Sequence, residues 1–226
     1  MGNKYILAID NSLEYLCISL SLEDEIVEER KIKNRQSPSQ IIGEEVLELL
    51  GKQDLKPGDL SLLLCTTGPG SFTGIRVALA FLKGMKVGLN IPLVGVPTLD
   101  CLAQIFSFMR GFYIFPMIDA KKGEVFCALY LSDGRKLERL TSYEAKKPFE
   151  IKDMIMKPCV ILGSGVKLIK GKIDEDVIMA SELFKHVPMA TLVKLGLERV
   201  NEGNQNILPV YGRRSEAELK YGVNLT

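Results

Sequence analysis

Hydrophobic residues in the first hundred positions form short runs with strand spacing and two longer runs with helical spacing. Residues 16–22 alternate between apolar and small polar side chains, as a half-buried strand does. Residues 61–65 are almost all apolar, which indicates a strand that is buried on both faces. Three strands, a helix, a strand, a helix and a strand are therefore expected, at residues 5–9, 16–22, 26–33, 41–50, 61–65, 73–89 and 93–96.

The second half of the chain repeats the start of this order. A strand at residues 113–118 ends in Asp119, as the strand at residues 5–9 ends in Asp10, and each is followed by a hairpin. Further strands are expected at residues 125–131, 135–140, 159–162 and 177–179, and a helix at residues 191–201. We therefore expect an α/β protein with two ribonuclease-H-like lobes, at residues 1–105 and 106–226, the second including the C-terminal segment.

A glycine-rich turn joins the strand at residues 61–65 to the helix at residues 73–89. Such a turn can direct backbone N–H groups and a helix N-terminus at an anion, which makes it a candidate phosphate cradle. The sequence lacks the lysine of a P-loop and the spacing of dinucleotide-binding glycines, so a plain tight turn is the favoured interpretation. The residues that would contact a phosphate or nucleotide are Asp10, Ser12, Gly68, Gly70 and Ser71.

The helix at residues 73–89 has more apolar surface than one sheet can cover. One apolar face of its helical wheel contains Ile75, Ala78, Leu82 and Met85, and a second, flatter face contains Val77, Phe81, Gly84 and Gly88. Either the helix at residues 41–50 covers the second face, or the two helices together form a surface for another subunit. The candidate interface residues are Phe72, Thr73, Val77, Ala80, Phe81 and Gly84.

The composition is that of an ordinary globular protein with balanced charge. Of 226 residues, 46% are hydrophobic, and 29 Lys and Arg against 28 Asp and Glu leave a net charge of +1. This balance argues against a stand-alone RNA-binding protein, because such proteins carry a basic excess. Five scattered cysteines indicate buried free thiols in a reducing compartment. Without a signal-peptide core or a membrane-length apolar run, the chain is expected to be soluble and cytoplasmic.

Five stretches, taken in order along the chain, resemble those of the TsaB (YeaZ) family. The most specific is the string Gly-Pro-Gly-Ser-Phe-Thr-Gly-Ile-Arg at residues 68–76. The others are residues 6–12, 92–96, 118–126 and 209–213, so that the resemblance spans almost the whole chain. Three positions depart from the family pattern, namely Asn11, Gln36 and Lys121. These departures weaken the transfer of site residues more than the family assignment.

The resemblance implies two ribonuclease-H-like lobes of the actin and sugar-kinase (ASKHA) type, with mixed sheets flanked by helices. It also implies a non-catalytic subunit of the complex that forms N6-threonylcarbamoyladenosine in tRNA. Such a subunit binds and activates the catalytic subunit TsaD, from which it differs in lacking a two-histidine metal motif. The chain itself has only one histidine, His186.

Further partners are implied by the same resemblance. The chain would form a homodimer when alone, through helices of the first lobe, and the ATPase TsaE would join the assembly. No cofactor or metal is expected in this chain, and ATP or ADP is expected only at a subunit interface of the complex. The chain would contact tRNA only through the complex, with Arg213 and Arg214 as candidate contacts, and would not contact a membrane.

A small-molecule kinase or ATPase is the main alternative, because such enzymes share the implied fold. Asp10 and Asp119 would then face each other across a cleft and bind magnesium. Against this, aspartates commonly end strands and turns, and Gly163-Ser-Gly165 is the only, short, candidate for an adenosine pocket. A peptidase is not supported, because one histidine cannot supply a zinc site and no Gly-x-Ser-x-Gly elbow is present.

Overall fold

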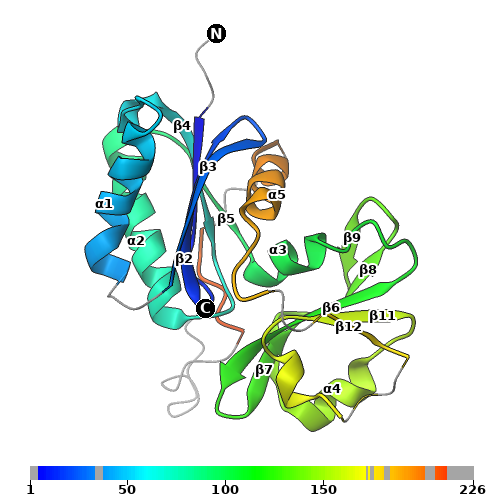
Figure 1. Cartoon of the computed structure of the whole chain (residues 1–226). Coiled ribbons are helices and arrows are strands. Elements are labelled where there is room, and N and C mark those ends of the chain that lie inside the picture. Colours follow the sequence, from blue (N-terminus) through cyan, green and yellow to red (C-terminus); the bar gives the residue numbers. More distant parts are fainter. Residues whose placement is uncertain are drawn as a thin grey trace.

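The computed structural model contains two β-sheets with helices packed on their faces (Figure 1). It describes residues 5–33, 38–171, 173, 176–180, 184–201 and 207–212. The strands of the first sheet are β1 (Tyr5–Asp10), β2 (Tyr15–Leu22), β3 (Glu25–Lys33), β4 (Leu60–Thr66) and β5 (Leu93–Val96). Their order is β3-β2-β1-β4-β5, in which β1 to β3 are an antiparallel meander and β4 and β5 run parallel to β1. The sheet is therefore mixed, as predicted.

The second sheet, like the first, begins with a strand that pairs antiparallel with the next strand along the chain. Its strands are β6 (Tyr113–Lys121), β7 (Glu124–Cys127), β8 (Tyr130–Ser132), β9 (Leu137–Arg139), β10 (Glu144–Lys146), β11 (Cys159–Leu162) and β12 (Ile178–Ala180). The main order is β10-β7-β6-β11-β12, with β11 parallel to both β6 and β12. The short strands β8 and β9 pair at the other end of β6. Both sheets thus combine a hairpin with parallel strands.

Helices cover both faces of the first sheet. On one face, α1 (Pro38–Gly51) and α2 (Phe72–Leu89) bury aliphatic side chains against β1, β2 and β4. On the other face lies α5 (Met189–Asn201), whose buried Leu192 and Val193 pack on Ile6 and Leu64. The short helix α4 (Pro148–Met154) packs on the second sheet through Ile151. Two short 3₁₀ helices are also present, at Pro57–Asp59 and Val166–Leu168.

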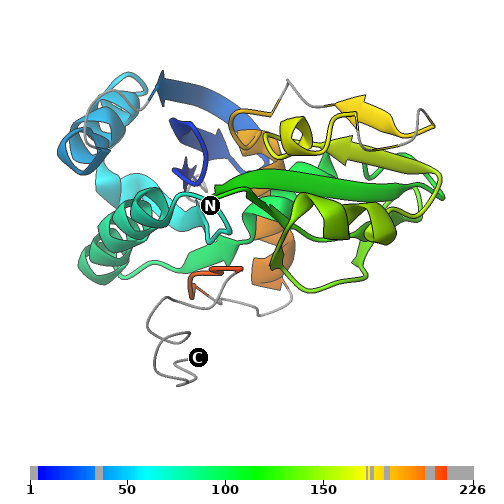
Figure 2. The same cartoon turned by 90° about the horizontal axis from the view of Figure 1, so that it is seen from below.

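The two halves of the sequence exchange elements. Helix α3 (Thr98–Gln104) belongs to the first predicted lobe, but its Leu99 and Leu102 pack against the second sheet. Helix α5 belongs to the second predicted lobe, yet it covers the first sheet and lies at the junction of the two lobes (Figure 2). The boundary at residues 105 and 106 remains a prediction, and a cut there would separate these packed elements.

A polar cluster centred on Asp100 joins the same elements. Its Oδ1 accepts hydrogen bonds from the hydroxyl groups of Tyr130 and Tyr143, each at 2.7 Å. Its Oδ2 accepts a hydrogen bond from Arg199 at 3.0 Å. Because Arg199 lies on α5, which covers the first sheet, and the two tyrosines pack with the second sheet, one carboxylate on α3 connects the elements of both sheets.

The element predictions were mostly confirmed. The seven elements expected before residue 97 are present, with ends shifted by a few residues. The prediction of a single strand at residues 125–131 was wrong. Two strands lie there, because β7 pairs with the end of β6 whereas β8 pairs with its start. The helices α3 and α4, the strand β10 and the 3₁₀ helices were not foreseen.

The five cysteines are free and buried, as predicted, and burial raises the pKa of the Cys65 thiol to about 12. In the described part of the chain, no helix is both long and apolar enough to cross a membrane.

Candidate functional site

Asp10 ends strand β1 with its carboxylate fully buried among donors of the chain itself. Oδ1 accepts hydrogen bonds from the backbone N–H of Ser12 at 3.0 Å, from the Ser12 hydroxyl at 2.5 Å and from the Thr66 hydroxyl at 2.7 Å. Oδ2 accepts a longer bond, of 3.4 Å, from the N–H of Val187. Burial raises the pKa of Asp10 although all these hydrogen bonds act to lower it. Both carboxylate oxygens are therefore engaged within the fold.

The glycine-rich turn packs directly on the residues that follow Asp10. A Cβ atom at Gly70 would overlap the carbonyl oxygen of Ser12, and one at Gly74 would overlap that of Asn11. Two hydrogen bonds stabilise the same contact. Ser71 N–H donates to the Ser12 carbonyl at 2.8 Å, and Asn11 Nδ2 donates to the Gly74 carbonyl at 3.2 Å. The glycines thus allow the N-terminus of α2 to touch the β1–β2 turn.

Ser71 caps helix α2, because its hydroxyl accepts a hydrogen bond from Gly74 N–H at 3.2 Å. Gly68, with φ +102°, lies so close to residues 207–212 that a Cβ would overlap the carbonyl oxygen of Val210. The structure therefore brings the five predicted phosphate contacts into one region. Their close internal packing favours the interpretation of this turn as a structural one.

The second aspartate, Asp119, also has partners of its own. Its Oδ2 lies 2.9 Å from Lys167 Nζ and 3.7 Å from Lys121 Nζ. Oδ1 accepts a hydrogen bond from Lys121 N–H at 2.8 Å. Burial acts to raise the pKa of Asp119, but these lysine contacts outweigh it and hold the pKa below its usual value. Lys167, and at a longer distance Lys121, thus place positive charge beside the Asp119 carboxylate.

The short glycine motif of the second lobe is tightly packed too. A Cβ at Gly163 would overlap the carbonyl oxygen of Met117, and the N–H of Gly165 donates to that oxygen at 2.9 Å. The hydroxyl of Ser164 accepts a hydrogen bond from Asp119 N–H at 3.1 Å. These contacts give each residue of the motif a role in joining β11 to β6.

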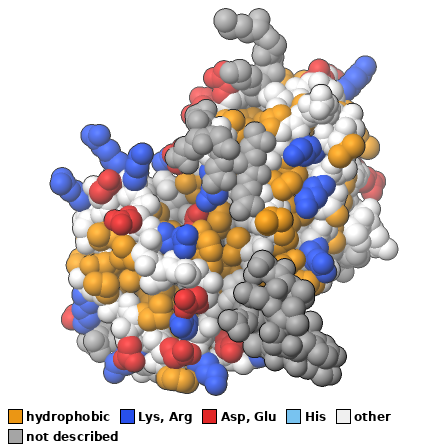
Figure 3. Space-filling view, turned by 180° about the vertical axis from the view of Figure 1, so that it is seen from behind, with side chains coloured by type: hydrophobic (Ala, Val, Ile, Leu, Met, Phe, Trp, Pro, Cys, Tyr) orange, Lys and Arg blue, Asp and Glu red, His pale blue; other side chains and the backbone are white. Residues whose placement is uncertain are grey.

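Helix α2 presents an exposed side with small and apolar residues, which we call the docking face. We define it as the predicted residues Phe72, Thr73, Val77, Ala80, Phe81 and Gly84 together with Val87. Phe72 is 53% exposed and Val87 82% exposed, and Thr73, Ala80 and Gly84 are exposed as well. Seen from behind, the first lobe shows hydrophobic side chains interspersed with Lys and Arg (Figure 3). Val87 was missed, although the helical wheel places it beside Ala80.

Helix α1 covers one edge of the docking face. A Cβ at Gly43 of α1 would lie 3.7 Å from the ring of Phe81, which is half-buried, as is Val77. Leu47 lies one turn further along the same side of α1 and is 60% exposed. The covering by α1 is therefore partial, and a surface for another subunit stays a prediction.

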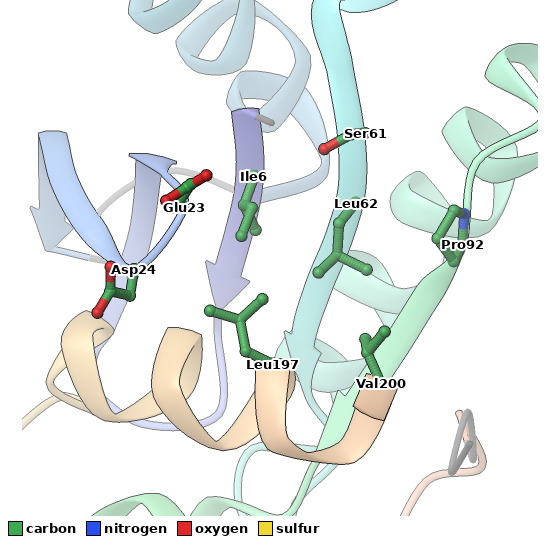
Figure 4. Close-up of a pocket in the computed structure, with 8 residues that line it drawn as sticks. All are labelled: Ile6, Glu23, Asp24, Ser61, Leu62, Pro92, Leu197 and Val200. Atoms are coloured by element: carbon green, nitrogen blue, oxygen red, sulfur yellow. The ribbon is translucent and has the colours of Figure 1, made fainter. Parts of the chain in front are cut away.

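A separate pocket of about 620 Å³ lies at the opposite end of the first sheet from Asp10. Ile6, Leu62 and Leu197 form its apolar wall, and Glu23 and Asp24 project from the β2–β3 hairpin at its edge (Figure 4). None of the predicted site residues lines it. Among the described residues, no group of three or more His, Cys, Asp or Glu could hold a metal. Arg213 and Arg214 lie outside the described residues.

The chain has the two-lobed actin-like fold. It matches a protein of Bacteroides thetaiotaomicron with an actin-like ATPase fold at a TM-score of 0.50 and 9% identity, over 85% of this chain and 96% of the other. YeaZ from Pseudomonas aeruginosa matches at a TM-score of 0.75 and 22% identity, over 92% of this chain and 99% of the other. The predicted fold class is thereby confirmed.

Sequence relatives define the family within this class. Residues 31–196 match the family model described as TsaD, tRNA N6-adenosine threonylcarbamoyltransferase. The tRNA threonylcarbamoyladenosine biosynthesis protein TsaB of Bacillus subtilis is 31% identical, over 96% of this chain and 97% of its own length. TsaB of Escherichia coli is also 31% identical, over 57% of this chain and 55% of its own length. The chain belongs to the TsaB (YeaZ) family, within the wider family that the TsaD model describes.

Proposed function

We propose that this chain is the non-catalytic partner subunit of the complex that forms N6-threonylcarbamoyladenosine in tRNA. In this role it binds the catalytic subunit TsaD and activates it. The family supports a place in this pathway, because the relatives are named as biosynthesis proteins of the modified nucleoside. The match to the TsaD family model supports kinship between the two subunits.

The observation that carries the proposal is the docking face of α2. An exposed helix side with Ala80, Gly84 and Val87 lets another helix approach closely and bury apolar surface. The alternative function, a small-molecule kinase or ATPase, has no comparable structural feature in its support. A kinase or ATPase needs aspartates that can hold magnesium, whereas Asp10 and Asp119 are held by groups of the chain itself.

Other members of the assembly follow from the same role. The chain forms a homodimer through the docking face when TsaD is absent, so that the homodimer and the complex with TsaD compete for one surface. TsaE joins the assembly, ATP or ADP binds only at a subunit interface, and tRNA is contacted only through the complex. A chain in this role works in the cytoplasm.

The proposal is tested by size-exclusion chromatography with light scattering on mixtures with purified TsaD. Ala80 is exposed, so Ala80→Glu leaves the fold intact but puts a long charged side chain where a partner helix must pack closely, which should abolish the contact. Phe81→Glu is a poorer choice, because Phe81 also packs near α1. Phe149→Glu is the control, since Phe149 is 70% exposed but lies on α4 in the second lobe.

Wild type and Phe149→Glu should elute with TsaD, and Ala80→Glu should elute alone with an unchanged circular dichroism spectrum. A wild-type chain that does not associate with TsaD contradicts the proposal. Equal binding by Ala80→Glu contradicts the assignment of the docking face.

A further inference from the structure

The C-terminal segment at residues 207–212 forms a strap between the two lobes (Figure 2). Val210 N–H donates to the carbonyl of Thr67, at the end of β4, at 2.7 Å. Two residues later, the carbonyl of Gly212 accepts a hydrogen bond from Ala145 N–H, on β10 of the second lobe, at 2.8 Å. Main-chain hydrogen bonds therefore fix the strap to both lobes.

Close packing fixes the strap further. Gly212 has φ +60°, and a Cβ there would lie 3.0 Å from the ring of Phe126 and 3.3 Å from Pro69. Val210 passes Gly68 at a distance that leaves no room for a Cβ. Tyr211 lies between these two contacts. The backbone on either side of it is thus fixed, and this holds its side chain in place.

Tyr211 connects the strap with the first turn of α2. Its ring centroid lies 5.2 Å from that of Phe72, and the guanidinium carbon of Arg76 lies 4.6 Å from the Phe72 centroid. Phe72 is 53% exposed and Tyr211 37%, so this group of three side chains reaches the surface. Phe72, Arg76 and Ala80 are four residues apart in turn and share one line of the helix. The group therefore continues the docking face beyond the start of α2.

The charge of this surface points to the chemistry of what it meets. Arg76, Lys83 and Lys86 are the only charged residues of α2. Within the described residues, no carboxylate forms an ion pair with any of the three. A guanidinium packed on an aromatic ring has lost conformational freedom but keeps its N–H edge for a carboxylate. A partner that fits this end of the face carries a carboxylate beside its apolar contact residues.

We propose that the docking face extends onto the strap, and that Arg76, supported by Phe72 and Tyr211, binds a carboxylate of the partner subunit. Tyr211 is a positioning residue, because it acts through Phe72 and Arg76. Since the strap is bonded to both lobes, it presents this group already ordered, which lowers the entropic cost of binding. The inference rests on the proposed function. It adds to that function a charged contact, made by Arg76, at one end of the docking face.

The test is a titration of labelled TsaD with the full chain at low and high salt. We expect Arg76→Glu to weaken binding about tenfold or more and to remove much of the salt dependence, as for a charge pair in an interface. The matched control is Lys194→Glu, which makes the same charge change at an exposed position of α5. Tyr211→Ala should weaken binding several-fold, and Tyr211→Phe, which keeps the ring, should bind as wild type does.

A double-mutant cycle with Phe72→Ala separates positioning from simple loss of contact. Tyr211→Ala should have little further effect once Phe72 is Ala, because the ring on which it acts is gone. The inference is overturned if Arg76→Glu and Tyr211→Ala bind as wild type while Ala80→Glu does not, an outcome that leaves the proposed function standing. Equal weakening by Lys194→Glu also overturns it, because the effect is then one of net charge. If every variant and the wild type fail to bind, the proposed function itself is wrong.

Discussion

At the scale of single residues, Asp10 shows how an aspartate at a strand end can serve the fold. Its carboxylate is fully buried and accepts hydrogen bonds from Ser12, Thr66 and Val187, which belong to three separate parts of the chain. The sequence predicted its place at the end of β1 but could not supply these partners, because Thr66 and Val187 are distant along the chain. The family departure at Asn11 likewise finds its partner, Gly74, sixty-three positions away.

Replacing Asp10 by Asn should reveal the effect of burial on the carboxyl group. Burial raises the pKa of Asp10 above its ordinary value of 3.8, so ionisation costs more in the folded than in the unfolded chain. Wild type should therefore lose stability relative to Asp10→Asn as the pH rises above 3.8, and the two should keep a constant difference below it. Urea unfolding from about pH 4 to about pH 8 measures this difference.

Asp10→Ala serves as the comparison, because it leaves the hydroxyl groups of Ser12 and Thr66 without an acceptor. It should be about 1–3 kcal/mol less stable than Asp10→Asn at every pH. A stability difference between wild type and Asp10→Asn that does not change with pH would contradict a raised pKa.

At the scale of elements, hydrophobic spacing located the long helices and most strands but not the short elements between the lobes. Helix α3 has only seven residues and is buried on more than one side, so it has no polar face to reveal a helical period. The apolar run at residues 125–131 predicted one strand, whereas the chain forms two short strands there, β7 and β8. The run could not show that β7 and β8 pair with different ends of β6, because pairing depends on distant residues.

Two glycines of helix α2 should respond in opposite directions to the same substitution. Gly84→Ala meets no atom within 4 Å, so it should stabilise the chain by about 0.5–1 kcal/mol through helix propensity. Gly74→Ala would press a methyl group into the carbonyl of Asn11, so it should destabilise the chain by roughly 3 kcal/mol. Each variant controls for the other in urea unfolding. A Gly74→Ala chain as stable as wild type would show that α2 does not touch the β1–β2 turn.

At the scale of the whole molecule, three structural features join the lobes. They are the exchange of α3 and α5, the Asp100 cluster and the strap. Each connects residues far apart in sequence, as Asp100 does with Arg199. The repeated pattern of strands therefore predicted two lobes but not how they are held together. The stretch at residues 209–213 could be recognised by its resemblance, whereas its position across both lobes is visible only in the structure.

The first predicted lobe should not fold alone. Residues 1–105 lack α5, whose Leu192 and Val193 cover Ile6 and Leu64 on one face of the first sheet. We expect this fragment to show no cooperative thermal transition in circular dichroism, because that face is left in water. Residues 184–201 attached through a flexible linker should restore the transition. A fragment of residues 1–105 that melts like the full chain would contradict the exchange of elements.

The most direct test of the central claim is reconstituted tRNA modification with TsaD and its remaining partners. Asp10→Asn is a change at the candidate chemical site, and Ala80→Glu is a change on the docking face. We predict that Asp10→Asn supports threonylcarbamoyladenosine formation as wild type does, whereas Ala80→Glu does not. The reverse pattern, with Asp10→Asn inactive although folded and Ala80→Glu fully active, would contradict a partner subunit and favour an enzyme.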